Sequence, residues 1–550
     1  MTLVKPAHFV LIPHGMWGHL RPLLGLSLNL LVLHPHLRLT LLLTPSVLTR
    51  VQQELHALTL VQPASASGAA AQMEDVDGHE EKKHTVTVRI QLITCVSKDY
   101  ELPKVFDPSA MVKEAVNYAA TLPEYIKVLF GDFGGEDGME GMVENKWKGL
   151  MPDFIIFDIF QPFVPDVIRN VMISIDRPMP PLVGFCPCNA TSVYHHFAAE
   201  ERGGFFTKMH RLGREEMAAG MDPSTAYDKH TFKSDGTVVS LPGLPAKFDF
   251  PLVETVPFPP GTMLAVIESY TCVHDKDVTA LVLPANAELE TEAVAALEKE
   301  IGKKVYMGGL QFTESVWNEE KPLRIAGNDD DERVLNFLDK MKNKHGSKSV
   351  CYISFGSMFF PVLRPDLVRY ILNTLRESDL PFVFAYASGL AVIPGDIVSE
   401  FKDDENSCMV KFAPQWQVLN HDAIGFFVTH CGSNSVAEAI MTETPIVGMP
   451  FAADQGVFAS LLTEVYKVGV TLKQVSTFAR PDFNRFKDGT KITSTEESIK
   501  SEMRDTWALM KGRSGAKMRE NMKGMQDIVR KSWKEGRAAR DMDTLGRLTL

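Results

Sequence analysis

The sequence lacks the features that mark several large protein classes. Acidic side chains outnumber basic ones among its 550 residues, and a net charge of −12 disfavours a surface that wraps nucleic-acid phosphate. No apolar run approaches the roughly 20 residues that a membrane-spanning helix needs. The N-terminus has no charged segment followed by an apolar core and a cleavage site, so no secretory signal is predicted. We therefore expect a soluble, cytoplasmic monomer that binds neither nucleic acid nor membrane through an integral segment.

Metal and dinucleotide motifs are missing as well. The seven cysteines are odd in number and scattered, and Cys186-Pro-Cys188 is too tight for a zinc knuckle, so we expect reduced thiols and no metal. The stretch PHGMWGHLRPLL (13–24) follows an apolar run and opens a helical segment, as a phosphate-binding turn does. It has glycine only at Gly15 and Gly18, and the missing G-x-G-x-x-G spacing disfavours a nicotinamide oxidoreductase. No cofactor is predicted.

The length and the apolar pattern predict two α/β domains. Single cores stop growing at roughly 250–300 residues, so this chain should divide. Short apolar runs alternate with longer segments of helical period, which is typical of doubly wound parallel sheets, and two such domains would face a central cleft. The predicted strands are 8–12, 39–44, 88–94, 154–158, 182–186, 280–284 and 304–308 in the first half, and 349–355, 382–386, 409–413, 425–429 and 445–450 in the second.

A stretch with proline, glycine and an acidic run separates the two halves. Apolar periodicity vanishes there, so we interpret it as a linker and its Asp329–Asp331 run as solvated charge. Near the C-terminus, Ser494 and Glu497 have the spacing of a capping box that would start a helix. The predicted division is 1–312 for the first domain, 313–334 for the linker, 335–520 for the second domain and 521–550 for C-terminal helices.

The most informative segment is FAPQWQVLNHDAIGFFVTHCGSNSVAEAIMTETPIVGMPFAADQ, residues 412–455. It reads as a strand, a tight turn, a helix beginning near Asn434 and a following strand. Gly432 lets the backbone approach a ligand, and the free N–H groups of the helix start form an anion site. His430, Asn434 and Ser435 could donate hydrogen bonds to a diphosphate without a metal.

This segment resembles, without a gap, the signature box of the UDP-sugar-dependent glycosyltransferases of the plant and fungal secondary-metabolite type. Their fold is GT-B, with two Rossmann-like domains, and their last helices cross back to the first domain. The resemblance implies a site for UDP-sugar, a co-substrate. It assigns uracil stacking to Phe412, base and ribose contacts to Gln415, diphosphate contacts to Ser357, His430, Asn434 and Ser435, ribose hydroxyls to Glu438, and sugar hydroxyls to Asp454 and Gln455.

Two positions depart from the family pattern. Phe412 and Ser433 stand where the family usually has tryptophan, which leaves a smaller stacking face and puts the shape of the sugar pocket in doubt. Gln455 matches the residue that is common in glucose-using members, so we expect glucose.

Each residue of this segment also has an ordinary structural interpretation. Ser435 and Glu438 fit a capping box, Phe412 could be core, His430 could be a buried histidine with a satisfied hydrogen bond, and Asp454-Gln455 could be a solvated loop. The number of matches at fixed spacing favours the nucleotide-sugar site over all of these.

The opening turn supplies a candidate general base. A hydroxyl acceptor has a pKa far above neutrality, so its attack needs a group such as histidine. His19 lies at the amino end of a helix, where the dipole disfavours the imidazolium, and Pro22 places the helix start near Leu20. Gly18-His19 matches the family's catalytic histidine. His14 is assigned to a loop, to the acceptor pocket with Trp17 and Phe160, or to a purely structural role.

A carboxylate should orient this base. Asp158 ends the buried run FIIFD at the carboxyl end of a predicted strand, from which side chains enter the cleft, and it matches the family's partner aspartate. It could instead cap the next helix. Asp153 precedes the strand and would lie at its opposite end.

These assignments predict an inverting transfer of a sugar from UDP-sugar to a hydroxyl of an apolar small-molecule or lipid acceptor. The acceptor pocket should be lined by the loops after residues 94 and 158 and by segment 185–197. A nucleotide-sugar epimerase or hydrolase on the same fold, and a silent nucleotide-sugar-binding protein, remain as alternatives.

Overall fold

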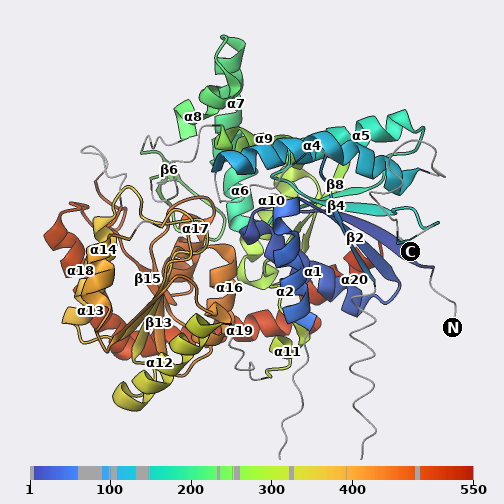
Figure 1. Ribbon diagram of the computed structural model, residues 1–550. Helices are drawn as coiled ribbons and strands as arrows, with labels where there is room; N and C mark the ends of the chain where they lie inside the picture. Colours follow the sequence, from blue (N-terminus) through green and yellow to red (C-terminus); the bar gives the residue numbers. More distant parts are fainter. Residues whose placement is uncertain are drawn as a thin grey trace, which may run out of the picture.

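The computed structural model describes residues 5–59, 89–97, 100, 108–131, 146–147, 149–231, 234, 236–250, 252, 261–320, 328–391, 393–476 and 484–548. Within this part of the chain two parallel sheets lie side by side, each with helices on both faces, and the prediction of two doubly wound units is confirmed (Figure 1).

The first sheet has seven parallel strands in the order β3-β2-β1-β4-β5-β8-β9. Its central strands are mostly apolar, and successive side chains of a strand point to opposite sides, so both faces of the sheet carry a core. Val10 and Ile12 pack into the core on one face, and Phe9 and Leu11 into the core on the other. The strands are β1 (Ala7–Ile12), β2 (Leu37–Leu43), β3 (Ile90–Thr94), β4 (Phe154–Asp158), β5 (Leu182–Phe185), β8 (Val278–Leu283) and β9 (Lys304–Met307).

The second sheet has six parallel strands in the order β12-β11-β10-β13-β14-β15. Val350 and Tyr352 face one of its cores, and Cys351 and Ile353 face the other. Its strands are β10 (Val350–Ser354), β11 (Phe382–Ala385), β12 (Ser407–Val410), β13 (Ile424–Thr429), β14 (Ile446–Gly448) and β15 (Gly469–Thr471). The three-residue β15 and a small antiparallel pair, β6 (Val238–Val239) with β7 (Lys247–Phe248), were not predicted from the sequence.

Each sheet has one point where the strand order reverses. In the first sheet, β1 lies between β2 and β4, so the chain builds outward in opposite directions from the β1–β4 pair. In the second sheet the corresponding pair is β10 and β13. Loops after the carboxyl ends of such a pair diverge and leave a crevice where ligands bind. His19 lies in the helix that follows β1, and Asp158 is the last residue of β4. The His430–Gly432 turn follows β13.

The helices cover both faces of each sheet (Figure 1). In the first half they are α1 (Trp17–Leu33), α2 (Leu48–Thr59), α4 (Pro108–Phe130), α5 (Val164–Ser174), α6 (Ala190–Phe197), α7 (Phe205–Ala218), α8 (Pro223–Thr231), α9 (Thr262–His274), α10 (Thr291–Ile301) and α11 (Glu314–Trp317). In the second they are α12 (Asp329–His345), α13 (Asp366–Glu377), α14 (Gly395–Phe401), α15 (Gln415–Leu419), α16 (Ser433–Met441), α17 (Gln455–Ser460), α18 (Glu496–Lys511), α19 (Arg513–Glu535) and α20 (Arg537–Gly546).

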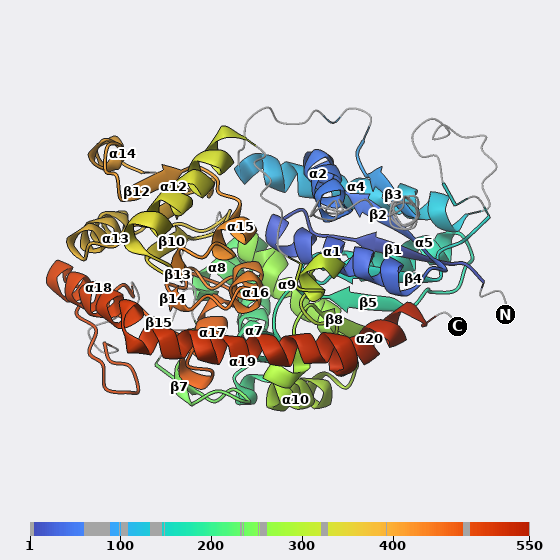
Figure 2. The ribbon, with the colours of Figure 1, turned by 90° about the horizontal axis from the view of Figure 1, so that it is seen from below.

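The last two helices join both halves. Helix α19 runs along one side of the molecule beneath the second sheet and leads into α20 against the first (Figure 2). Met522 and Met525 belong to a core of the second half, whereas Met542 and Leu545 belong to a core of the first.

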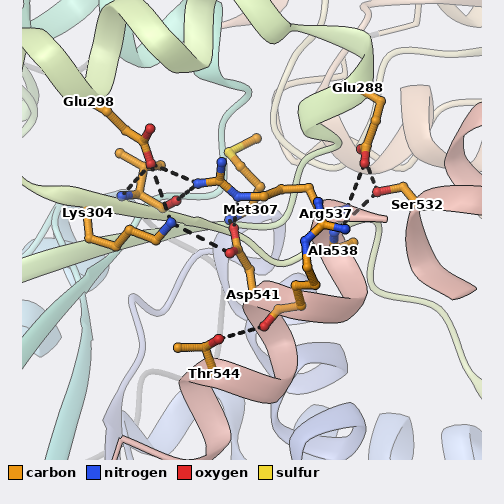
Figure 3. A network of polar contacts seen from close by, with 11 residues as sticks. Glu288, Glu298, Lys304, Met307, Ser532, Arg537, Ala538, Asp541 and Thr544 are labelled. Carbon is orange, nitrogen blue, oxygen red and sulfur yellow. Dashed lines mark hydrogen bonds and ion pairs between the residues drawn. The ribbon is translucent and has the colours of Figure 1, made fainter. Parts of the chain in front are cut away.

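A polar network fastens α20 to the first half (Figure 3). The guanidinium of Arg537 donates to Asp541 at 2.6 Å and to Glu298 at 2.8 Å, and the N–H of Met307 donates to Asp541 at 2.8 Å. Glu288 accepts from the N–H of Arg537 at 2.7 Å. Because charged or backbone donors pair with each of these carboxylates, α20 is held against β9.

Three local predictions were wrong. Helix α1 begins at Trp17, not near Leu20. The Asp329–Asp331 run forms the first turn of α12, where acidic side chains favour the helix dipole, and Asp331 is buried. Helix α18 is capped by Thr495, whose hydroxyl accepts from the N–H of Ser498 at 3.3 Å, instead of by Ser494.

All seven cysteines are free and buried. No helix among the described residues is long and apolar enough to cross a membrane.

Candidate active site

A cavity of about 910 Å³ lies where the two reversal points face each other. The first half contributes residues that include His19, Arg21 and Phe160, and the second half contributes the turns after β10 and β13. In Figure 1 the two halves meet where α16 approaches α1. The two sheets thus direct their loops into one shared space.

His19 and Asp158 form a pair at the first reversal point. Nδ1 of His19 lies 2.9 Å from Oδ2 of the fully buried Asp158, although 139 residues separate them in sequence. The other oxygen of Asp158 accepts from the N–H of Phe160 at 2.9 Å, and the Phe160 ring meets the His19 ring edge to face, with centroids 5.1 Å apart. When Nδ1 carries the proton that Asp158 accepts, Nε2 keeps a free lone pair.

His14 lies beside this pair. Its Nδ1 accepts from the N–H of Met16 at 3.1 Å, and its ring centroid is 5.2 Å from that of His19. Burial, with a further contribution from His19, lowers the pKa of His14 to about 4, so the ring is neutral. Trp17 and Phe160 line the cavity, whereas His14 does not, and the guanidinium of Arg50 lies over Trp17 at 3.7 Å.

The second reversal point contains a helix start and a buried histidine. Gly432 is the N-cap of α16, so the free N–H groups of its first turn point toward the cavity end of the sheet. Burial lowers the pKa of His430 to about 4, and its Nδ1 has no hydrogen-bond partner among the described residues. The ring fits because its neighbours are glycines: a Cβ would lie 2.8 Å from it at Gly356 and 2.4 Å at Gly432.

Glu438 is the centre of a polar cluster on the same helix. Its buried carboxylate accepts from Gln415 Nε2 at 2.5 Å and from Arg21 Nη1 at 2.7 Å, while Gln415 Nε2 also lies 3.2 Å from Ser435 Oγ. Tyr352 donates to the amide oxygen of Gln415 at 3.3 Å. The capping-box interpretation of Ser435 and Glu438 is wrong, because both lie inside a helix capped by Gly432.

The remaining residues of the signature segment reach the same cavity. Phe412 leaves 54% of its surface exposed, so the alternative that it belongs to the core is wrong. Ser357 and Ser433 line the cavity as well. Asn434 also bridges the halves, because its Nδ2 donates to the carbonyl of Gly18 at 3.2 Å.

Asp454 and Gln455 are buried, which excludes the interpretation as a solvated loop. Burial raises the pKa of Asp454 to about 7, and the nearby His19 partly offsets this. The amide oxygen of Gln455 accepts from the N–H groups of Phe451 at 2.8 Å and Ala452 at 3.2 Å. This leaves the amide nitrogen of Gln455 as the donor that can serve a ligand.

Comparisons with known proteins agree on one family. The family model described as UDP-glucoronosyl and UDP-glucosyl transferase matches residues 331–483. A UDP-glycosyltransferase of Hericium erinaceus, eriJ, is 25% identical over 96% of this chain and 95% of that protein. The chain is similar to UDP-glycosyltransferases over almost its whole length. An anthocyanidin 3-O-glucosyltransferase of Fragaria ananassa is 37% identical over 36% of this chain and 41% of that protein.

The fold of the chain is GT-B. A UDP-glucose:anthocyanidin 3-O-glucosyltransferase, solved with UDP, superposes with a TM-score of 0.64 at 20% identity and covers 99% of both chains. A Medicago truncatula protein complexed with UDP-glucose superposes with the same TM-score at 18% identity and covers 98% of both.

Sequence reasoning missed several residues that line the cavity. Arg21 is one, and its signal was available: it is the single formally charged residue among the 17 of α1. Phe206 is another, and it lies against His196, which belongs to segment 185–197 that the sequence did assign to the acceptor pocket. Their rings stack at 4.2 Å with 8° between the planes, on the side that also carries Met263. Burial holds the pKa of His196 well below its usual value, so this wall is neutral and largely apolar.

Proposed function

We propose that this enzyme transfers glucose from UDP-glucose to a hydroxyl of an apolar small molecule, with inversion at the anomeric carbon. The observation that carries the proposal is the pairing of His19 with a buried Asp158 in a cavity whose opposite wall is the start of α16. A base and an anion site facing one another are what a displacement by a hydroxyl requires.

In the proposed mechanism His19 Nε2 takes the proton of the acceptor hydroxyl as its oxygen attacks C1 of the sugar. Asp158 fixes the tautomer of His19 and stabilises the imidazolium that forms. The C1–O bond to the diphosphate breaks, and UDP leaves toward the first turn of α16. Attack from the face opposite to the leaving group converts an α-linked donor into a β-glycoside.

The donor assignment rests on the segment 412–455. The exposed Phe412 offers a face for uracil, Glu438 offers oxygens for the ribose hydroxyls, and the free N–H groups of α16 with His430, Asn434, Ser435 and Ser357 offer donors for the diphosphate. Fixed donors would stabilise the leaving group without a metal cofactor. Chelator that abolished turnover of the purified enzyme would contradict this part.

The sugar would bind at Asp454 and Gln455, which supply acceptors and one amide donor to its hydroxyls. Glucose is favoured by Gln455 and by relatives named as glucosyltransferases, although an anthocyanidin 3-O-galactosyltransferase of Actinidia chinensis, 32% identical over 36% of this chain, is also similar. Competition between UDP-glucose and UDP-galactose would separate the two.

The acceptor would lie against the wall made by Phe160, Cys188, His196, Phe206 and Met263. These side chains are apolar or neutral, so a phenol, terpenoid, sterol or hydroxylated lipid suits them better than a charged molecule. The test is to incubate the protein with several UDP-sugars and a panel of such aglycones and to identify the products by mass spectrometry and the anomeric configuration by NMR. UDP release without glycoside in every case would favour a hydrolase instead.

A further inference from the structure

Arg21 crosses from the first half of the molecule to a carboxylate of the second. From α1, its Nη1 donates to Glu438 Oε1 at 2.7 Å and its Nε donates to Glu54 Oε1 at 3.0 Å. The side chain of Glu438 is 3% exposed and that of Arg21 is 32% exposed. The two carboxylates raise the pKa of Arg21 above its ordinary value, although burial acts in the opposite direction. A buried acidic group on α16 thus has its cationic partner on α1.

The carboxylate of Glu438 has room for Arg21 and for a ribose. An ionised carboxylate offers about four acceptor positions, and Arg21 and Gln415 use one on each oxygen. The two that remain suffice for two ribose hydroxyls. Arg21 therefore need not leave when a nucleotide binds, and its contact restricts how the carboxylate can turn.

Charge balance also depends on Arg21. The cavity is lined by Arg21 and Arg50, against the carboxylates of Glu54, Glu438 and Asp454. A buried carboxylate without a cationic partner costs free energy, and it repels a diphosphate nearby. Without Arg21, the partner of Glu438 that remains among the described residues is the neutral amide of Gln415.

Helix α1 links this contact to the proposed base. Arg21 lies two residues after His19, and the carbonyl of Gly18 accepts from Asn434 of α16. The first turns of α1 are therefore held against α16 at two points on either side of His19.

We propose that Arg21 is a positioning residue of the donor site, which holds the carboxylate of Glu438 oriented for the two ribose hydroxyls. UDP-sugar binding then depends on a residue from the half of the chain that lacks the nucleotide-sugar signature. This inference rests on the proposed function, because it takes Glu438 as the ribose contact.

The test compares the affinities of UDP and 2′-deoxy-UDP for the full chain by calorimetry. Arg21→Ala should bind UDP about tenfold more weakly, the loss expected for a charge-assisted hydrogen bond. Arg21→Lys should recover part of the affinity, because an ammonium can still pair with Glu438. The loss caused by Arg21→Ala should be smaller for 2′-deoxy-UDP, since one of the hydroxyls that Glu438 serves is absent.

A double-mutant cycle identifies the route of the effect. If Arg21 acts through Glu438, the Arg21→Ala/Glu438→Gln enzyme should bind UDP no more weakly than Glu438→Gln alone. In turnover, Arg21→Ala should raise KM for the UDP-sugar more than it lowers kcat.

Three results would overturn the inference: unchanged UDP affinity in Arg21→Ala, an equal loss for UDP and 2′-deoxy-UDP, or additive losses in the cycle. Circular dichroism checks folding. If the alanine variant does not fold, Arg21→Gln replaces it and removes the charge but retains a donor. A wild-type protein that fails to bind UDP would instead contradict the proposed function itself.

Discussion

At the carboxyl edge of the first sheet, His19 lines the cavity and is paired with the buried Asp158 behind it. At the same edge of the second sheet, the wall is made of a helix start, two glycines and a neutral buried histidine. The topology is the same at both places, yet one wall suits proton transfer and the other suits an anion.

This contrast shows that the repeated α/β architecture sets where a crevice forms, whereas the residues at each crevice set its chemistry. A reversal of strand order opens a crevice in either sheet. Asp158 is useful because the end of β4 brings it beside the residue that follows β1. Gly432 is useful because a side chain there would collide with the ring of His430 at the start of α16.

The sharpest way to break the comparison is to remove the proposed base. His19→Ala should lower turnover by about 10³-fold, within the range for loss of a general base, because it removes the group proposed to take the acceptor proton. UDP affinity should change little, since the nucleotide contacts belong to the second half. Product formation by mass spectrometry and UDP binding by calorimetry measure the two effects.

His345→Ala, which removes an imidazole at the far end of α12, serves as the control and should be active. Retained transfer in His19→Ala would end the division of roles between the two walls.

The partner carboxylate should matter somewhat less. Asp158→Asn keeps an oxygen for the N–H of Phe160 but offers His19 an amide that favours the wrong tautomer. Turnover should fall by about 10²-fold, the lower end of the range for general acid–base catalysis. Asp153→Asn is the matched control. Asp153 lies before β4 and accepts from the N–H of His8 at 2.9 Å, which an amide oxygen can also do. Equal losses of kcat in the two variants would mean that Asp158 acts only on folding.

The pH dependence of donor binding tests the proposed contact between Asp454 and the sugar. Burial raises the pKa of Asp454 to about 7, so below pH 7 this carboxyl is protonated and accepts sugar hydroxyls poorly. The affinity for UDP-glucose relative to UDP should therefore fall by up to about tenfold between pH 8 and pH 6. Asp454→Asn should remove this dependence. A wild-type ratio that stays constant across this range would contradict the assignment of Asp454 to the sugar.

The smallest expected effect concerns uracil stacking. Phe412→Trp enlarges the exposed face, and base stacking contributes about 1–3 kcal/mol per base, so UDP affinity should rise by about threefold. Phe359→Trp is the matched control, because Phe359 is a second phenylalanine nearby, with its ring centroid 5.8 Å from that of His430. Weaker UDP binding in Phe412→Trp would show that the smaller ring fits a space that tryptophan cannot enter.

Much of the fold was predictable because strands and helices have different apolar periods. The predicted strands 154–158 and 425–429 coincide with β4 and β13 within one residue. β15 was missed because three residues are too few to form a pattern. The true start of α18 was missed because Ser494 and Thr495 are both good caps, and only the backbone geometry selects between them.

The segment proposed to bind the donor was predictable for a related reason. Residues 412–455 are contiguous, so their spacing alone places Phe412, His430 and Asp454 on one strand–turn–helix–strand unit. The Arg21–Glu438 contact was not predictable in this way, because 417 residues separate its members.

The sequence by itself determined the two doubly wound units, the helix start that suits an anion and the identity of the candidate base, because each depends on neighbours along the chain. The tertiary structure decided which groups meet. It set Asp158 within hydrogen-bonding distance of His19, gave the buried Glu438 a cation from the other half and raised the pKa of Asp454. These properties depend on burial and on distance through space, and the order of residues in a chain carries neither quantity.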